Sequence, residues 1–239
     1  MAYSTIPKGS LYMNTKLYTG NGTTDTPQTG VGFQPDWTWI KGRSVAFDNN
    51  VFDAVRGPTK RLITNSTNAE TTANEMIKSF NSDGFTLGND DGVNKNSDTF
   101  VAWNWKANGQ GSSNTDGSIN TTYTSASVSA GFSISSYTGT GSNATVGHGL
   151  GVAPKMIIVK NRGGTQGWGV YNASLGNTKY LQLNDTAAEG TASTFWNNTT
   201  PTNQVFSIGT SGWMNDSGNN YIAYCFAEKK GFSKFDSYG

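Results

Sequence analysis

The sequence predicts an all-β protein built from two tandem, homologous antiparallel β-sandwich modules with jelly-roll or lectin-like layering, preceded by a short N-terminal arm. Three observations predict it: a long internal repeat, apolar residues that alternate at strand spacing, and frequent glycine-containing turns. We expect the arm at residues 1–16, the first module at 17–118 and the second at 119–239, with a linker near 107–118.

Residues 17–106 and 136–239 are two copies of one unit. The matched pairs include Tyr18-Thr-Gly-Asn-Gly22 with Tyr137-Thr-Gly-Thr-Gly141, Pro35 with Pro154, Lys41 with Lys160, and Phe85-Thr-Leu-Gly88 with Phe206-Ser-Ile-Gly209. The offset is 119 for the first three pairs and 121 for the last. A period near 120 is too long for a solenoid repeat, so each copy is a module of domain size.

The copies share glycines, a proline, apolar positions, one Lys and one Arg, but other polar and charged side chains differ. Asp53 corresponds to Asn172, and Arg56 corresponds to Leu175. Because no catalytic set occurs in both copies, we interpret the repeat as architectural.

Alternation at strand spacing is almost the whole secondary-structure signal of the chain. Trp37 and Trp39 share one face of a predicted strand, and Trp103 and Trp105 share one face of another. We expect these four tryptophans in the core. Pairs such as Asp83-Gly84 supply the backbone angles that tight turns need.

Three segments are less regular. Thr67-x-x-Glu70 has the form of a capping box and predicts a short helix over residues 68–79. Residues 107–117 have linker composition, whereas residues 121–128 alternate and fit an edge strand. Gly131-Phe-Ser133 recurs as Gly231-Phe-Ser233. Either a terminal strand completes the second module, which we favour, or the chain is cut from a longer array.

Composition excludes several classes of protein. The chain has 30 Gly, 14% charged residues and a net charge of +1, yet its 7 Trp, 10 Tyr and 12 Phe supply the apolar area of a core. No basic face is present to bind nucleic acid, and no apolar run is long enough for a membrane span. The start of the chain has no signal-peptide pattern.

Two single residues are candidates for chemistry, and both have a simpler interpretation. His148, the only histidine, lies in a glycine-flanked turn without an obvious carboxylate or nucleophile. Cys225, the only cysteine, lies between aromatic residues in a predicted strand. We expect a locally bonded loop histidine and a buried, inert thiol.

Carboxylates suggest neither a metal site nor a glycosidase. The stretch 89–98 is rich in oxygen ligands but lacks the spacing and closing glutamate of an EF-hand, so we expect a solvated hairpin turn. Asp48, Asp53, Glu70 and Glu75 do not lie two apart on a strand, as paired carboxylates of sandwich hydrolases do. We expect no enzyme activity, no cofactor and no bound metal.

Candidate interaction residues are aromatic or apolar. Trp168, Trp196 and Trp213 lie in Gly/Asn/Thr-rich segments and have no tryptophan partner in the first copy, so we expect them in an exposed binding surface. Apolar residues of the arm also have no repeat partner. We expect the arm, through Tyr3, Ile6 and Tyr12, to lie extended against a neighbouring protein.

Several long motifs resemble those of repeat-containing virion structural proteins of tailed marine bacteriophages, of the cyanophage type, which are often described as tail-fibre-like. They include Val31-Gly-Phe-Gln-Pro-Asp-Trp-Thr-Trp-Ile-Lys41, Phe80-Asn-Ser-Asp-Gly-Phe-Thr-Leu-Gly88 and Gly147-His-Gly-Leu-Gly-Val-Ala-Pro-Lys-Met-Ile-Ile-Val-Lys-Asn-Arg162. The resemblance covers nearly the whole chain. It implies a non-enzymatic, self-assembling component of the particle and carries no catalytic residues to transfer.

The resemblance leaves three functions open. The chain is expected to be a tail-fibre or adhesin-type virion protein, a capsid decoration or head-fibre protein, or a glycan-binding receptor-recognition module. The implied partners are other virion proteins, further copies of the chain and a host surface glycan, with no nucleic acid and no membrane. The implied location is the virion, assembled in the host cytoplasm.

Overall fold

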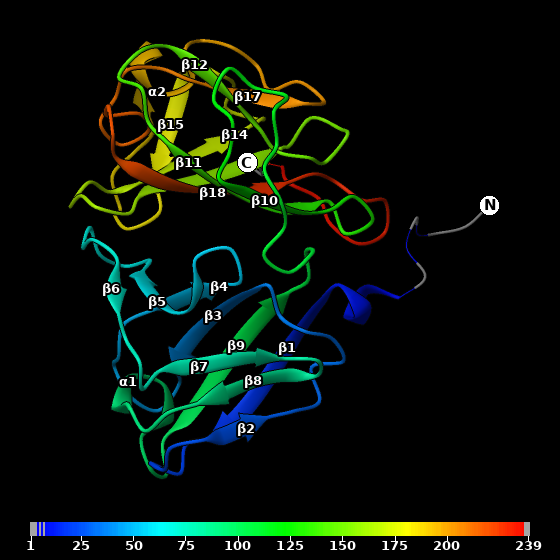
Figure 1. Cartoon of the computed structure of the whole chain (residues 1–239), viewed down its shortest axis with the longest axis vertical. Coiled ribbons are helices and arrows are strands. Elements are labelled where there is room, and N and C mark those ends of the chain that lie inside the picture. Colours follow the sequence, from blue (N-terminus) through cyan, green and yellow to red (C-terminus); the bar gives the residue numbers. More distant parts are fainter. Residues whose placement is uncertain (1–3, 5, 7, 237–239) are drawn as a thin grey trace. The chain divides into compact units, whose positions relative to one another are not determined.

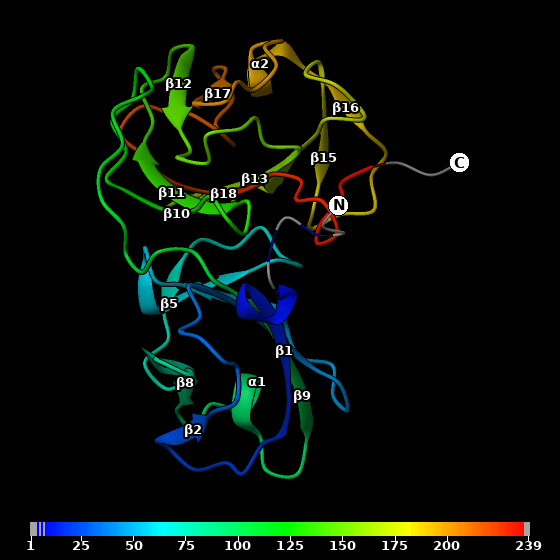
Figure 2. The same ribbon diagram turned by 90° about the vertical axis from the view of Figure 1, so that its right-hand side faces the viewer.

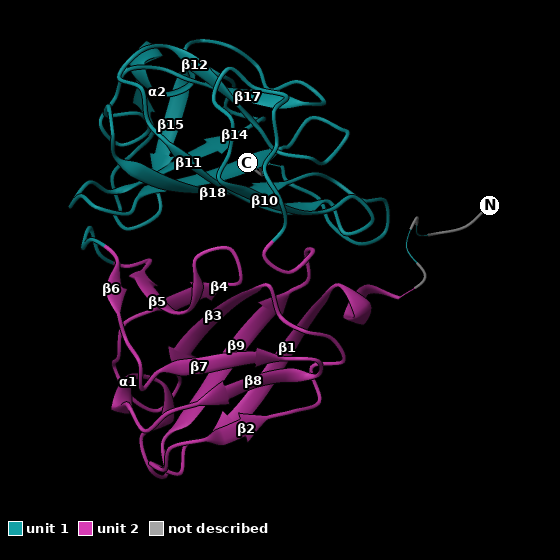
Figure 3. Ribbon diagram, in the orientation of Figure 1, with its two compact units in different colours: residues 1–7, 66–69, 111–239 teal, residues 8–65, 70–110 magenta. Residues whose placement is uncertain are grey.

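The computed structural model describes residues 4, 6 and 8–236 and divides into two compact units (Figures 1 and 3). The N-terminal unit comprises residues 8–65 and 70–110. The C-terminal unit comprises residues 66–69 and 111–236, together with Ser4 and Ile6. The main division therefore falls between Gln110 and Gly111, eight residues before the predicted module boundary at 118.

The N-terminal unit is a two-layer antiparallel β-sandwich. Its large sheet has the order β1 (Met13–Thr19), β9 (Thr99–Trp105), β3 (Trp37–Gly42), β4 (Asn50–Asp53), β5 (Gly57–Ile63) and β6 (Thr71–Thr72). Its small sheet has the order β2 (Thr26–Gln28), β8 (Gly84–Leu87) and β7 (Ile77–Asn81). Figure 2 shows β2 and β8 facing β1 and β9 as a second layer. A 3₁₀ turn, η1 (Gly9–Leu11), and one helical turn, α1 (Asp91–Asn94), complete this unit.

The C-terminal unit repeats this architecture. Its large sheet has the order β10 (Tyr123–Ser127), β11 (Phe132–Thr138), β18 (Asn220–Phe226), β13 (Met156–Asn161), β14 (Trp168–Asn172), β15 (Lys179–Gln182) and β16 (Gly190–Thr191). Its small sheet pairs β12 (Ala144–Gly147) with β17 (Val205–Ile208), and α2 (Ser193–Trp196) precedes β17. With β10 set aside, the large sheets of the two units have the same strand order. The predicted all-β fold of antiparallel sandwiches is confirmed.

Apolar side chains from both layers form the core of each unit. In the N-terminal unit, residues of the large sheet such as Ile40 and Phe100 pack with Phe85 and Leu87 of the small sheet. In the C-terminal unit, Val159 and Ile208 belong to the corresponding cluster.

The same polar anchors recur in both cores. Asn94 and Asn215 are fully buried, and their side-chain amides donate to the carbonyls of Gly88 (2.8 Å) and Gly209 (2.9 Å). Their side-chain oxygens accept from the backbone N–H groups of the Gly-x-Gly loop in each copy, at Asn21 (3.0 Å) and at Thr140 (2.7 Å). The repeat thus preserves individual hydrogen bonds as well as strand order.

The tyrosine that opens each repeat is held in the same way. The hydroxyl of Tyr18 donates to the carbonyl of Val93 (2.7 Å), and that of Tyr137 donates to the carbonyl of Met214 (2.8 Å). Because burial penalises the phenolate, the pKa of both tyrosines is raised.

Some sequence predictions are wrong in detail. No helix forms over residues 68–79: the Glu70 carboxylate accepts from Arg56 (3.1 Å) instead of capping a helix, and Thr71–Thr72 pairs with β5. The first strand begins at Met13 rather than at residue 17. The segment 89–98 contains a helical turn, in which Asp90 accepts from the N–H of Gly92 (2.8 Å), rather than a hairpin.

The segments around the second module have a mixed outcome. The predicted edge strand near 121–128 is confirmed as β10, which pairs with β11. The predicted terminal strand is not formed within the described residues up to 236. There the chain makes a turn closed by an isolated bridge between Lys229 and Ser233.

Candidate interaction surface

The two faces of the large N-terminal sheet have different roles. The face of β3 and β9 that carries Ile40, Phe100 and Ala102 packs in the core. Because side chains alternate along a strand, the tryptophans of β3 and β9 lie on the opposite, outer face. Trp37 is buried as predicted, but Trp39, Trp103 and Trp105 are only half-buried. The prediction that these three belong to the core is wrong.

Sheet register brings the outer-face tryptophans together. Trp39 lies opposite Trp103, and Trp105 lies between Trp37 of β3 and Met13 of β1. The ring centroids are 4.5 Å apart for Trp37 and Trp105 and 6.3 Å apart for Trp39 and Trp103, the latter in an edge-to-face arrangement. Such aromatic pairs hold each other in fixed positions.

These side chains line a shallow apolar hollow of about 330 Å³. Its lining is Met13, Trp39, Trp103 and Trp105, which we call the tryptophan surface. The indole N–H of Trp39 is buried without a hydrogen-bond partner. The hollow itself is apolar, so it suits a flat apolar group.

The tryptophans predicted from sequence to be exposed lie elsewhere. Trp168 and Trp196 are buried: Trp168 stacks on Tyr224 (6.5 Å) and Trp196 packs edge-on against Tyr171 (5.6 Å). Trp213 is half-buried and packs against Phe195 (5.6 Å) at the rim of the core. The expectation of an exposed surface at Trp168 and Trp196 is wrong, because Trp168 lies on β14 of the large sheet and Trp196 belongs to the core cluster.

The arm residues are not gathered into a surface in the described structure. Ile6 is buried and Tyr12 is half-buried, with its carbonyl accepting from the N–H of Lys106 (2.8 Å). Tyr3 lies outside the described residues.

His148 closes a turn. Its Nδ1 accepts from the N–H of Leu150 (3.1 Å), which leaves the proton on Nε2 to donate to the carbonyl of Thr202 (3.2 Å). Burial lowers the pKa of this imidazole, so the neutral ring is favoured. Cys225 is fully buried, and burial raises the pKa of its thiol. Both residues are placed as the sequence interpretation expected.

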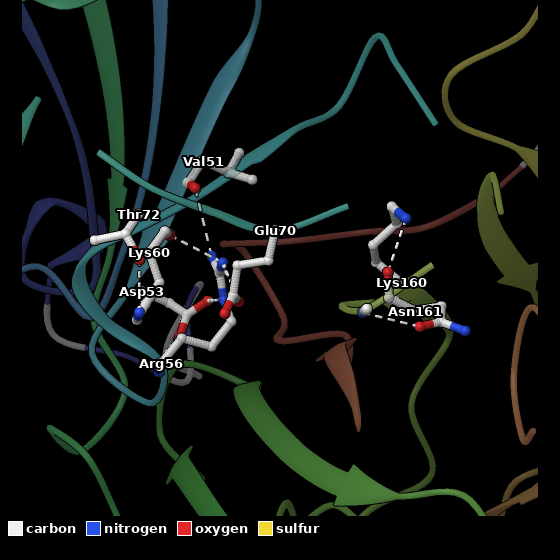
Figure 4. A network of polar contacts seen from close by, with 9 residues as sticks. Val51, Asp53, Arg56, Lys60, Glu70, Thr72, Lys160 and Asn161 are labelled. Atoms are coloured by element: carbon white, nitrogen blue, oxygen red, sulfur yellow. Dashed lines mark hydrogen bonds and ion pairs between the residues drawn. The ribbon is translucent and has the colours of Figure 1, made fainter. Parts of the chain in front are cut away.

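Three of the four carboxylates considered for glycosidic chemistry, Asp48, Asp53 and Glu70, are engaged by arginines, and Glu75 accepts from the hydroxyl of Thr24 (3.2 Å). Arg56 is buried and binds both Asp53 and Glu70, and its guanidinium also donates to the carbonyls of Lys60 (2.9 Å) and Val51 (3.4 Å) (Figure 4). Asp48 pairs with Arg61 (3.0 Å).

A buried lysine is the most perturbed amine. The ammonium of Lys160 donates to the carbonyls of Asn161 (2.8 Å) and Gly164 (2.9 Å) (Figure 4). Burial lowers the pKa of Lys160 to about 8.

The tryptophan surface was missed because both faces of the predicted strands are apolar. The repeat carries a signal that identifies the core face. A small residue, Ala102 or Ala223, occupies the same core position in both copies, whereas Trp103 is replaced by Tyr224. Close packing between layers favours small residues, so the alanine marks the inner face.

Neither helix in the described part of the chain is long or apolar enough to cross a membrane. Among the described residues, no three His, Cys, Asp or Glu side chains are grouped as metal ligands would be.

Residues 8–239 match the model of a protein family described as a domain of unknown function, DUF7483, and the chain belongs to this family. No curated protein and no solved structure shows significant similarity to it.

Proposed function

We propose that this chain is a non-enzymatic structural component of a tailed-phage virion, of the tail-fibre or adhesin type or attached to the particle surface, that assembles with neighbouring virion proteins. The observation that carries the proposal is the tryptophan surface. Three half-buried tryptophans on the outer face of a sheet are typical of a protein interface, where aromatic side chains supply most of the binding energy.

Two further features support it. The sequence motifs resemble those of phage virion proteins, and the copies share buried anchors such as Asn94 and Asn215, while other polar positions such as Asp53 and Arg56 are not kept. A repeated framework with varied polar residues is what we expect of a structural protein rather than of an enzyme.

Electron microscopy of purified particles labelled with an antibody against this chain tests the proposal. Label at the tail supports the fibre or adhesin role, and label at the head assigns the chain to capsid decoration or a head fibre. Particles that carry no label, in a preparation whose lysate contains the protein, contradict the proposal.

The arm gives this role a second test. The arm carries apolar side chains such as Tyr3 and Ile6 ahead of the repeated strands, and we propose that it fixes the protein to a neighbour in the particle. Because Tyr12 and Met13 pair with the sheet, the deletion must stop before them, at residues 2–7. The truncated protein is expected to fold but to be lost from particles. Normal incorporation would show that attachment lies on the sandwiches.

A second candidate, glycan recognition, is favoured by the half-buried rings of Trp39 and Trp103 that line the hollow. Aromatic faces stack on sugars. Trp39→Phe replaces the indole in the hollow with a smaller ring, whereas Trp213→Phe makes the same change in the other unit. On a glycan array, binding that is lost in the first variant and kept in the second supports recognition. No bound glycan, or equal loss in both variants, contradicts it.

A further inference from the structure

The large sheets of the two units differ at one edge. In the C-terminal unit β10 covers the edge of β11, whereas in the N-terminal unit β1 is the edge strand. At seven residues, β1 is the longest edge strand of the described sheets. Open edges present unpaired backbone groups, and proteins usually keep such strands short.

The register shows which backbone groups of β1 are open. Tyr12 accepts from Lys106 and Gly20 donates to Asp98, so the even-numbered residues of this strand bond to β9. The N–H and C=O groups of Met13, Thr15, Leu17 and Thr19 consequently point away from the sheet. The N–H of Thr15 instead bonds to the side chain of Asn14 (3.0 Å).

The equivalent groups of β11 are paired. Leu17 corresponds to Ser136, whose carbonyl accepts from the N–H of Thr122 (2.8 Å). The turn that brings β10 back onto β11 ends at Gly131, with a left-handed φ of 69°. The equivalent residue in the first copy is Tyr12, with a φ of −127°. Residues 8–12 therefore make no such turn before β1, and no described strand pairs with this edge.

Space beside β1 is also open. A side chain added at Gly149 would meet Ala126 of β10 at 3.1 Å, whereas one added at the equivalent Gly30 would meet only the end of Lys16, at 3.9 Å. Among the described residues, four large apolar side chains are well exposed, and two of them belong to this region: Leu17 (57%) and Leu11 (43%).

We propose that β1 pairs antiparallel with β1 of a second copy of this chain, which joins their large sheets across a two-fold axis. This inference deepens the proposed assembly role by naming a partner. It is tested in solution, so its failure is distinguishable from failure of the virion assignment.

Charge and side-chain position select one register. With Thr15 opposite the partner's Thr15, Leu17 lies opposite the partner's Met13 and Lys16 lies opposite the partner's Asn14. In the neighbouring register, with Thr15 opposite the partner's Leu17, Lys16 would lie opposite the partner's Lys16. Like charges directly opposite each other are unfavourable. The selected register also brings Leu17 beside the hollow that Met13 helps to line, which covers apolar surface on both copies.

Proline at the centre of the edge tests the pairing. Thr15→Pro removes an N–H that points away from β9 and is bonded only locally, so the folded chain tolerates it. The full chain is expected to dimerise in sedimentation equilibrium. Thr15→Pro loses two hydrogen bonds at the two-fold axis and should weaken dimerisation by about tenfold or more. Thr15→Val, which keeps the N–H, should dimerise like the wild type.

Cysteine cross-linking tests the register and does not depend on the proline variant folding. Thr15→Cys places two thiols opposite each other at the axis, within disulfide range. Leu17→Cys is the matched control, because in this register two copies of residue 17 lie about 13 Å apart. Oxidation is expected to give a covalent dimer of T15C and not of L17C. A wild type that stays monomeric at about 100 µM, a concentration at which a dimer of about micromolar Kd is nearly fully formed, would overturn the proposal. So would cross-linking of L17C at the rate of T15C, or a dimer that survives Thr15→Pro.

Discussion

The side chain of His148 makes two hydrogen bonds to backbone groups and so stabilises a turn. His148 corresponds to Thr29 of the first copy, and its ring spans from Leu150 to Thr202. His148→Ala removes both hydrogen bonds and leaves buried groups unpaired, so we expect a loss of about 1–3 kcal/mol in the free energy of unfolding at pH 7.5. Urea denaturation measures it.

The same variant should reveal the titration of this ring. Because the folded-state pKa lies below the ordinary value of 6.5, the unfolded chain binds the proton first as the pH falls. The stability that the neutral ring contributes is present above pH 6.5 and is lost as the pH falls through the folded-state pKa. The difference between wild type and His148→Ala should therefore shrink at pH 5. A constant difference would show that the ring is not titrating in this way.

The lowered pKa of Lys160 predicts a change of stability with pH on the alkaline side. Its pKa of about 8 lies below the ordinary value of 10.5, so the unfolded state binds more protons between these values. Stability should rise with pH from about 8 to 9.5, a window that ends below the ordinary tyrosine pKa of about 10. Lys160→Met should flatten this rise in chemical denaturation series. An unchanged slope would assign it to other groups.

Turn geometry sets the strand content of the two sheets. Gly131 ends the turn between β10 and β11, and a side chain there would meet the carbonyl of Ala227 at 2.6 Å. Gly131→Ala should destabilise the chain by about 1–3 kcal/mol, through backbone strain and this close contact. Gly218→Ala is the control: its φ is also positive, at 79°, but no atom lies within 4 Å of the added group. Equal thermal unfolding of the two variants would contradict the role of the contact.

Sequence reasoning succeeds for elements with strong alternation and fails where side-chain partners decide. Glu70 has the spacing of a helix cap, but its carboxylate binds the buried guanidinium of Arg56. The next residues, Thr71–Thr72, form a strand that pairs with β5. The sequence does not reveal that partnership. The same limit applies to the candidate surface, since alternation identifies two faces of β9 without showing that the one with Ala102 packs inward.

At the scale of the whole molecule, the repeat predicts matched responses to matched changes. Asn94 and Asn215 make equivalent buried hydrogen bonds in separate units. Asn94→Ala and Asn215→Ala should each lower the free energy of unfolding by about 1–3 kcal/mol. Their effects in the double variant should add within about 0.5 kcal/mol, because distant sites are independent. Differential scanning calorimetry of the four proteins measures both, and a strongly sub-additive double variant would contradict equivalent, independent anchors.

The free edge of β1 also fixes how many neighbours that edge can hold. Once β1 has paired with β1 of a second copy, this edge is occupied in both chains, because each chain has one β1. Growth through this strand has a valence of one and stops at a pair. Any larger array must therefore alternate this contact with a chemically different one. Blocking β1 would leave the other contact intact and make single chains, rather than dimers, the units that assemble.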